Sequence, residues 1–271
     1  MMREVPVLAA LLTAAALATA PIAAVAQAIV PGDPYADDPA GIVAQPCPDH
    51  PKPANGEEWR MSNLHMLTRD HGQLCRYAAA NAELKQPVRV VFIGDSITDG
   101  WIGADPSLFT DGVVDRGIGG QTTSQMLIRF RQDVIALRPQ AVHIMAGTND
   151  IAGNTGAQTM ETVQGHIQSM AELARAHGIK VILASIPPAG AFPWSPARRP
   201  VPQIAAMNAW LRGYARANGF TYVDYHGAMA TADGAMKPGL ATDGVHPTPA
   251  GYAVMRPLAR AAIAQALGTR R

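Results

Sequence analysis

The sequence predicts a three-layer α/β/α domain built around a parallel sheet. Short apolar segments recur from residue 88 towards the C-terminus, and amphipathic segments with apolar residues at helical spacing lie between them. Strands that alternate with helices in this way form parallel sheets with right-handed crossovers and helices on both faces. The sequence shows no internal repeat and no second domain.

The expected strands and helices alternate along the chain. Residues 88–93 are β-branched or aromatic apart from Arg89, which is typical of a strand buried on both faces. Further strands are expected at 113–118, 141–146, 179–186 and 220–223. Helices are expected at 57–84, from Thr122 or Thr123 towards Leu137, at about 158–177, at 203–218 and at about 249–267. Pro257 is expected to bend the last helix.

The first 26 residues predict a cleaved signal peptide. Arg3 precedes an apolar run from 5 to 20, and residues 24–26 have the small-x-small pattern of a signal-peptidase site. An uncleaved membrane anchor is the alternative, but alanine is weakly hydrophobic and Pro21 interrupts the run. We therefore expect an exported protein, periplasmic or secreted, without stable membrane insertion.

Residues 27–55 are expected to form an extended arm, because they are rich in Pro, Asp and Gly and lack an apolar period. The domain is then expected at 56–271. Cys47 and Cys75 are the only cysteines, and an even count in an exported chain favours a disulfide between them. Two unpaired buried thiols are the alternative.

The charge balance limits the kind of partner. The chain of 271 residues carries 22 Lys plus Arg and 21 Asp plus Glu, a formal net charge of +1. It has no basic stripe, so nucleic-acid binding is not expected. His65 and His71 lack companion residues at ligand spacing, so no metal site is expected. The sequence does not indicate an oligomeric state.

Polar residues gather where the expected strands end. Ser96 follows the first strand, and Gly120 and Asn149 follow the next two. Because the carboxyl ends of parallel strands share one edge of the sheet, where α/β folds bind ligands, we expect these residues to meet. The backbone N–H groups of Ser96 and Gly120 and the Asn149 amide are then candidate donors to an oxyanion. Helix capping by Ser96 and loop formation by the other two are the alternatives.

The final loop carries a candidate base. Asp243 and His246 are three residues apart with Gly244 between them, so one turn can carry both side chains. The carboxylate would accept the proton on one imidazole nitrogen and leave the other to deprotonate a serine hydroxyl. A simple turn is the alternative, because Asp-Gly is strong turn chemistry.

Taken together, these residues resemble the SGNH hydrolases, also called GDSL-type esterases and lipases. The blocks that carry the resemblance are Gly94-Asp95-Ser96, Gly117-Ile118-Gly119-Gly120, Gly147-Thr148-Asn149-Asp150 and Asp243-Gly244-Val245-His246-Pro247, in the order of the family. The chain departs from the family at Asp115, where Asn is common. No Gly-x-Ser-x-Gly elbow is present, unlike in ordinary α/β-hydrolases.

The resemblance implies a flavodoxin-like fold with five parallel strands in the order 2-1-3-4-5. It implies that Ser96 is the nucleophile, that His246 acts as base and then as acid, and that Asp243 orients the imidazole. Ser96, Gly120 and Asn149 would form the oxyanion hole. No metal or organic cofactor is implied.

Other side chains are assigned supporting roles. Asp95 and Asp150 are expected to hold the loops of the site by accepting backbone donors. The insert at 187–202 should overhang the site, with Phe192, Trp194 and Arg198 as candidate substrate-binding residues. The alternative is that its aromatic residues pack on its own prolines. Four further histidines lie elsewhere in the chain: His226 is a weaker rival base, His143 is expected in the core, and His166 and His177 are expected at a surface.

These observations predict a serine esterase that removes short acyl groups, with acetyl the leading acyl group and carbohydrate the leading substrate class. The expected partner is a small-molecule or glycan ester. A lysophospholipase or acyltransferase with the same residues is one alternative. A non-catalytic binding module on the same scaffold is the other.

Overall fold

The computed structural model describes residues 55–68 and 70–268. The predicted signal peptide, nearly all of the predicted arm and Cys47 lie outside these residues, so the domain boundaries and the disulfide to Cys75 stay predictions. None of the helices in the described ranges combines the length and the apolar character that a bilayer crossing requires.

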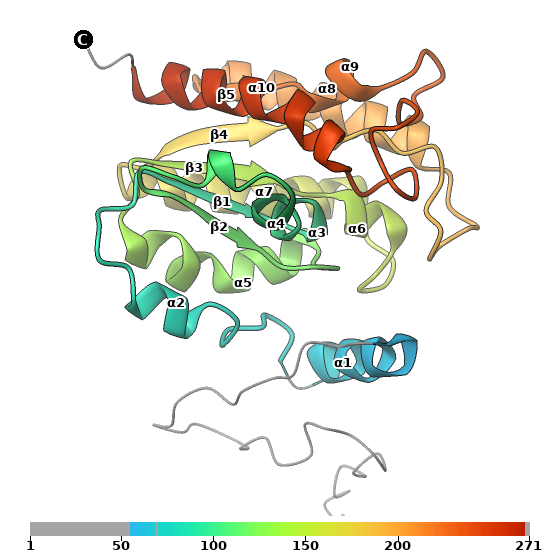
Figure 1. Ribbon diagram of the computed structural model, residues 1–271, viewed down its shortest axis with the longest axis horizontal. Coiled ribbons are helices and arrows are strands. Elements are labelled where there is room, and N and C mark those ends of the chain that lie inside the picture. Colours follow the sequence, from blue (N-terminus) through green and yellow to red (C-terminus); the bar gives the residue numbers. More distant parts are fainter. Residues whose placement is uncertain (1–54, 69, 269–271) are drawn as a thin grey trace, which may run out of the picture. The chain divides into compact units, whose positions relative to one another are not determined.

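The described chain forms a five-stranded parallel sheet in the order β2-β1-β3-β4-β5, which confirms the predicted fold (Figure 1). The strands are β1 (Val90–Gly94), β2 (Val113–Gly117), β3 (Ala141–Met145), β4 (Lys180–Ala184) and β5 (Thr221–Val223). Every residue of β1 and β3 is buried, as expected for central strands covered on both faces.

Helices cover both faces of the sheet (Figure 1). The long helices are α1 (Gly56–Thr68), α5 (Thr123–Asp133), α7 (Met160–Ala176), α8 (Pro200–Asn218) and α10 (Pro249–Leu267). The short ones are α2 (Ala78–Ala82), α3 (Ser96–Asp99), α4 (Trp101–Ala104), α6 (Thr148–Ala152) and α9 (Tyr225–Met229), with 3-10 turns η1 (Pro106–Leu108) and η2 (Ile135–Leu137). The helices α5, α7 and α8 pack on one face, and α4 and α10 on the other.

The prediction of a single helix at 57–84 is wrong. Helix α1 ends at Thr68, and the chain turns before α2 begins. The carbonyl groups of His71 and Gly72 accept hydrogen bonds from Gln125 and Gln121 side chains, so they are not available to a helix. Gly72 also packs so closely on α5 that a Cβ there would lie 2.6 Å from Cγ2 of Ile128. Contacts with α5 therefore override the local helical pattern.

Two glycines let α3 cross directly over the strand ends. A Cβ on Gly94 would lie 2.1 Å from Oγ1 of Thr98, and one on Gly117 would lie 2.1 Å from the backbone nitrogen of Asp99. The two glycines are register partners on β1 and β2. Because both lack side chains, the residue that begins α3 is held at the carboxyl edge of the sheet.

Candidate active site

Ser96 is the first residue of α3, immediately after β1. Asp95, not Ser96, caps this helix: its carboxylate accepts the Ile97 N–H at 2.9 Å. The serine side chain is therefore not used in capping. Burial raises the pKa of Asp95 to about 6, although the Ile97 N–H and the nearby His246 ring oppose that shift.

The Ser96 hydroxyl lies next to a histidine and a carboxylate from the loop before α10. Its Oγ is 2.9 Å from Nε2 of His246, and Nδ1 of His246 is 2.7 Å from Oδ2 of Asp243. The other Asp243 oxygen accepts the backbone N–H groups of Val245 at 3.0 Å and His246 at 2.8 Å. Gly244 provides the turn, with φ of +83°. Serine, imidazole and carboxylate are thus in one hydrogen-bonded row.

The Asp243 carboxylate keeps its charge in this position. Partial burial alone would raise its pKa, but the hydrogen bonds from the backbone and ring of His246 outweigh it and hold the pKa below its usual value. An ionised carboxylate at Nδ1 favours the tautomer that leaves Nε2 free to accept a proton from Ser96.

The candidate oxyanion donors line the same cavity as Ser96. The Ser96 N–H is in the first turn of a helix and so has no acceptor within that helix. Gly120 has a φ of +78°, which glycine adopts without strain. The Asn149 amide donates one hydrogen to the carbonyl of Gln121 at 3.0 Å. Because a carboxamide has two hydrogens, one remains for a ligand.

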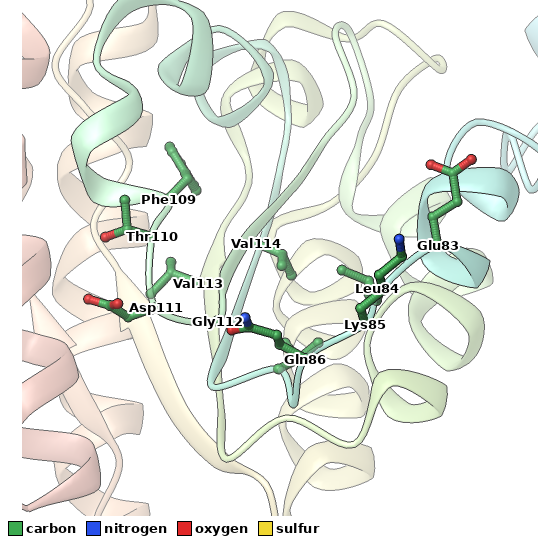
Figure 2. Close-up of a pocket in the computed structure, with 11 residues that line it drawn as sticks. Glu83, Leu84, Lys85, Gln86, Phe109, Thr110, Asp111, Gly112, Val113 and Val114 are labelled. Atoms are coloured by element: carbon green, nitrogen blue, oxygen red, sulfur yellow. The ribbon is translucent and has the colours of Figure 1, made fainter.

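The cavity has a volume of about 550 Å³. It is lined by Trp59, Asn63, Met66, Leu67, Ser96, Gly119, Gly120, Asn149, Asn154, Trp194 and His246. A second cavity, of about 350 Å³, lies at the amino ends of β1 and β2 and contains none of the predicted site residues (Figure 2). The first cavity is therefore the candidate active site.

The sequence also matches a known protein family. Residues 92–254 match the model of the GDSL-like Lipase/Acylhydrolase family. The chain belongs to this family. The matched range contains Ser96, Gly120, Asn149, Asp243 and His246.

Two solved structures of similar proteins align with most of this GDSL-like chain. A GDSL-like lipase from Bacteroides thetaiotaomicron VPI-5482 is 48% identical, with a TM-score of 0.70 over 72% of this chain and 99% of that chain. A structure from Bacteroides fragilis NCTC 9343 is 49% identical, with a TM-score of 0.71 over 73% of this chain and 99% of that chain.

A curated relative matches over a shorter range. The uncharacterized lipoprotein YqeF of Bacillus subtilis (strain 168) is 38% identical over 79 residues, which is 28% of this chain. The match spans about a third (32%) of the length of that relative.

The predicted substrate contacts need correction. Of the three side chains expected to contact substrate, only Trp194 lines the cavity. Phe192 is completely buried and stacks beneath Trp194, with ring centroids 5.2 Å apart, so it supports that ring from below. The Arg198 guanidinium lies over Gly153 and is not among the residues that line the cavity.

The supporting carboxylate Asp150 holds the start of α5. It accepts the backbone N–H of Thr123 at 3.0 Å and the Thr123 hydroxyl at 2.6 Å. Burial raises the pKa of Asp150, against these hydrogen bonds. His166, expected at a surface, is half-buried, and its Nδ1 lies 2.9 Å from the same hydroxyl.

Rival histidines lie elsewhere. His143 bonds the Tyr225 hydroxyl at 2.9 Å, and burial lowers its pKa to about 3, so it is the core residue that was expected. His226 is outside the residues that line the cavity, and burial lowers its pKa. Across residues 55–68 and 70–268, no three His, Cys, Asp or Glu side chains gather as a metal site would require.

Sequence reasoning missed the contribution of α1 and of Asn154. The lining residues of α1 are Trp59, Asn63, Met66 and Leu67, whose spacing places them on one face of the helix. Apolar residues also occupy other faces, including the buried Met61 and the partly exposed Leu64. The pattern therefore indicated an amphipathic helix but not which face meets the site.

Proposed function

We propose that this protein hydrolyses carboxylic esters of short acyl groups through an acyl-enzyme on Ser96. The observation that carries the proposal is the hydrogen-bonded row from Ser96 Oγ to His246 Nε2 at 2.9 Å and from His246 Nδ1 to Asp243 at 2.7 Å. This row is the arrangement that turns an alcohol into a nucleophile at neutral pH.

Each step uses a group already in place. Ser96 Oγ attacks the ester carbonyl carbon while its proton passes to Nε2 of His246, and Asp243 stabilises the imidazolium. The carbonyl oxygen becomes an oxyanion that accepts hydrogen bonds from the Ser96 and Gly120 N–H groups and the Asn149 amide. His246 then gives its proton to the leaving alcohol, and the acyl group stays on Ser96. Water, deprotonated by the same imidazole, releases the acid and restores the serine.

The lining of the cavity favours an uncharged substrate. Among its described lining residues none is Asp, Glu, Lys or Arg, so it offers no cation to a phosphate headgroup. Aromatic and apolar surface comes from Trp59, Met66, Leu67 and Trp194. Such surface suits the face of a ring, and we propose acetyl esters as the preferred class and O-acetylated carbohydrate as the natural substrate. Export, which the first 26 residues predict, would place the enzyme with extracytoplasmic glycans.

The test is Ser96→Ala, assayed with p-nitrophenyl acetate. Loss of the nucleophile should lower turnover by at least about four orders of magnitude, because members of a triad act as a unit. Ser169→Ala is the matched control, since that hydroxyl bonds only a helix carbonyl, Gly165 O, at 2.9 Å. Circular dichroism checks that both variants fold.

Turnover by folded Ser96→Ala comparable to the wild type would remove the serine from the mechanism and overturn the proposal. A panel of acetyl, butyryl and longer esters, together with acetylated glycans, then defines the substrate. Activity that rises with acyl length would contradict the acetyl preference, and acyl transfer to sugar or lipid acceptors would indicate a transferase.

A further inference from the structure

Asn154 contacts Gly120 and Asn149, two of the three candidate oxyanion donors. Its Nδ2 donates to the carbonyl of Gly120 at 3.1 Å and to Oδ1 of Asn149 at 2.9 Å. Helix α6 ends at Ala152, and its C-cap Gly153, with a φ of +82°, turns the chain back so that Asn154 lines the cavity. One carboxamide therefore joins the loop after β2 to the helix after β3.

The orientation of this amide is determined by its partners. Nε1 of Trp194 donates to Oδ1 of Asn154 at 3.1 Å. An indole N–H can only donate and a carbonyl oxygen can only accept, so Oδ1 must face Trp194 and Nδ2 must face Gly120. The chemistry of the neighbours thus fixes which end is which.

The orientation of the Asn149 amide is determined in the same way. Its Oδ1 accepts from Asn154, and its Nδ2 donates to Gln121 O at 3.0 Å. With both ends fixed, the group that Asn149 has left for an oxyanion is the second hydrogen of its Nδ2. If the amide were flipped, an oxygen would face the developing oxyanion and repel it.

The loop after β4 supplies the anchor. Besides the Trp194 bond, the Ser195 hydroxyl donates to the carbonyl of Ala152 at 2.9 Å, and the guanidinium of Arg198 covers Gly153. The segment that carries Trp194 is therefore docked on the end of α6. Trp194 is also beside the His246 ring, with centroids 5.7 Å apart.

We propose that Asn154 is a positioning residue that sets the donor orientation of Asn149 and holds the Gly120 backbone, and that Trp194 fixes Asn154 in turn. The inference rests on the proposed ester hydrolysis at Ser96. Asn154 acts through its neighbours and needs no contact with the substrate.

The test is Asn154→Asp, which keeps the size of the side chain and the acceptor for Trp194 but removes the donor. The carboxylate then faces Gly120 O and Asn149 Oδ1, which favours the wrong Asn149 orientation. We expect kcat for p-nitrophenyl acetate to fall about 10- to 100-fold with KM within about threefold, because only transition-state binding is lost. Inhibition by a trifluoromethyl ketone, whose adduct carries an oxyanion, should weaken by a similar factor.

Two further variants separate positioning from folding. Trp194→Phe keeps an aromatic ring but removes the indole donor, and should give a smaller fall in kcat with the same parallel loss of ketone affinity. Asn218→Asp is the matched control, because that amide bonds Tyr214 O at 3.0 Å on α8, outside the residues that line the cavity. It should leave kcat and ketone affinity unchanged.

A purely structural role would lower the melting temperature while the folded enzyme keeps its kcat and its ketone affinity, and that result overturns the inference. If Asn154→Asp does not fold, unchanged kcat and ketone affinity in Trp194→Phe also overturn the inference. Failure of the proposed function is distinct, because it would appear in the wild type as ester turnover that does not depend on Ser96.

Discussion

Asp115 is a carboxyl group whose surroundings disfavour its charge. It is buried on β2 and accepts the Gly117 N–H at 2.7 Å. Burial raises its pKa from 3.8 to about 7, and the nearby Asp99 adds to the shift. Between these values the folded chain binds a proton that the unfolded chain releases. Stability must therefore fall as pH rises through this window, by about 1.4 kcal/mol per unit and about 4 kcal/mol in all.

We predict that Asp115→Asn stabilises the protein at neutral and alkaline pH. Asparagine keeps the oxygen that accepts from Gly117 but has no charge to bury. The variant should match the wild type near pH 4 and exceed it by about 2–4 kcal/mol at pH 8. Urea unfolding at pH 4, 6 and 8 measures this difference. Asp233→Asn is the control, because a hydrogen bond from Thr231 lowers the pKa of that exposed carboxyl, so its removal should not stabilise the protein at alkaline pH. A difference that does not change with pH would contradict the prediction.

The sequence predicted the residues of the candidate site that lie in one turn or directly after the strands of the parallel sheet. Asp243 and His246 are joined by a turn of three residues, and Ser96 follows its strand directly. Asn154 could not be predicted, because its contacts reach Gly120 and Trp194, 34 and 40 residues away. Phe192 and Trp194 look alike in the sequence, yet one is buried and the other is 42% exposed. Only the packed loop distinguishes them.

At the scale of elements, α1 lines the candidate site together with the segments that follow the strands. It supplies one apolar face to the cavity, and Trp59 on that face remains 48% exposed. An exposed large aromatic residue that lines a cavity has surface left for a ligand. We therefore assign helix α1 to the substrate side of the proposed site, whose proposed catalytic residues lie on the segments after the strands.

We predict that Trp59→Ala weakens the binding of esters that carry a ring. Loss of an aromatic contact of about 1–1.5 kcal/mol should raise KM for phenyl acetate roughly 5- to 10-fold. Ethyl acetate, which has no ring to stack, should show a much smaller change. Steady-state kinetics with both esters measures the effect, and Ile128→Ala, an exposed apolar residue of α5 outside the cavity, is the control. Equal changes in KM for the two esters would show that Trp59 does not select for rings.

Most of the elements were predictable because their periods are clear. The strands are apolar runs between turn residues. Helix α8 is followed directly by Gly219, and α7 is followed by His177 and Gly178. The short helix α6 was missed, since Thr148–Ala152 has too few residues to show a period. The break between α1 and α2 was missed because its cause is contact with α5, which no local pattern records.

At the scale of the whole molecule, Arg129 connects the sheet to the loop after β2. It is completely buried on α5 and donates to the carbonyls of Gly94 at 3.1 Å and Arg116 at 2.8 Å, at the ends of β1 and β2. It also donates to the Gln121 side chain at 2.6 Å. The backbone carbonyl of Gln121 is in turn the acceptor for Asn149. One guanidinium therefore bonds the ends of β1 and β2 and the side chain of Gln121 in the loop after β2.

The charge of Arg129 is supported mainly by the carboxylate of Asp133. Burial lowers its pKa, and Asp133 opposes that shift through an ion pair at 3.2 Å. A buried pair of this kind need not add net stability, but removal of one partner leaves the other charged and without compensation. The fold therefore tolerates loss of both charges better than loss of either one.

We predict that Arg129→Met lowers the free energy of unfolding by about 3–5 kcal/mol, because Asp133 loses its cationic partner and two strand-end carbonyls each lose a charged donor. The double variant Arg129→Met/Asp133→Asn should recover part of this loss, since no isolated charge remains. Urea unfolding of the wild type, both single variants and the double variant gives the coupling energy between the two side chains. A single variant within about 0.5 kcal/mol of the wild type, or a double variant no more stable than Arg129→Met, would show that the guanidinium does not hold the strand ends together.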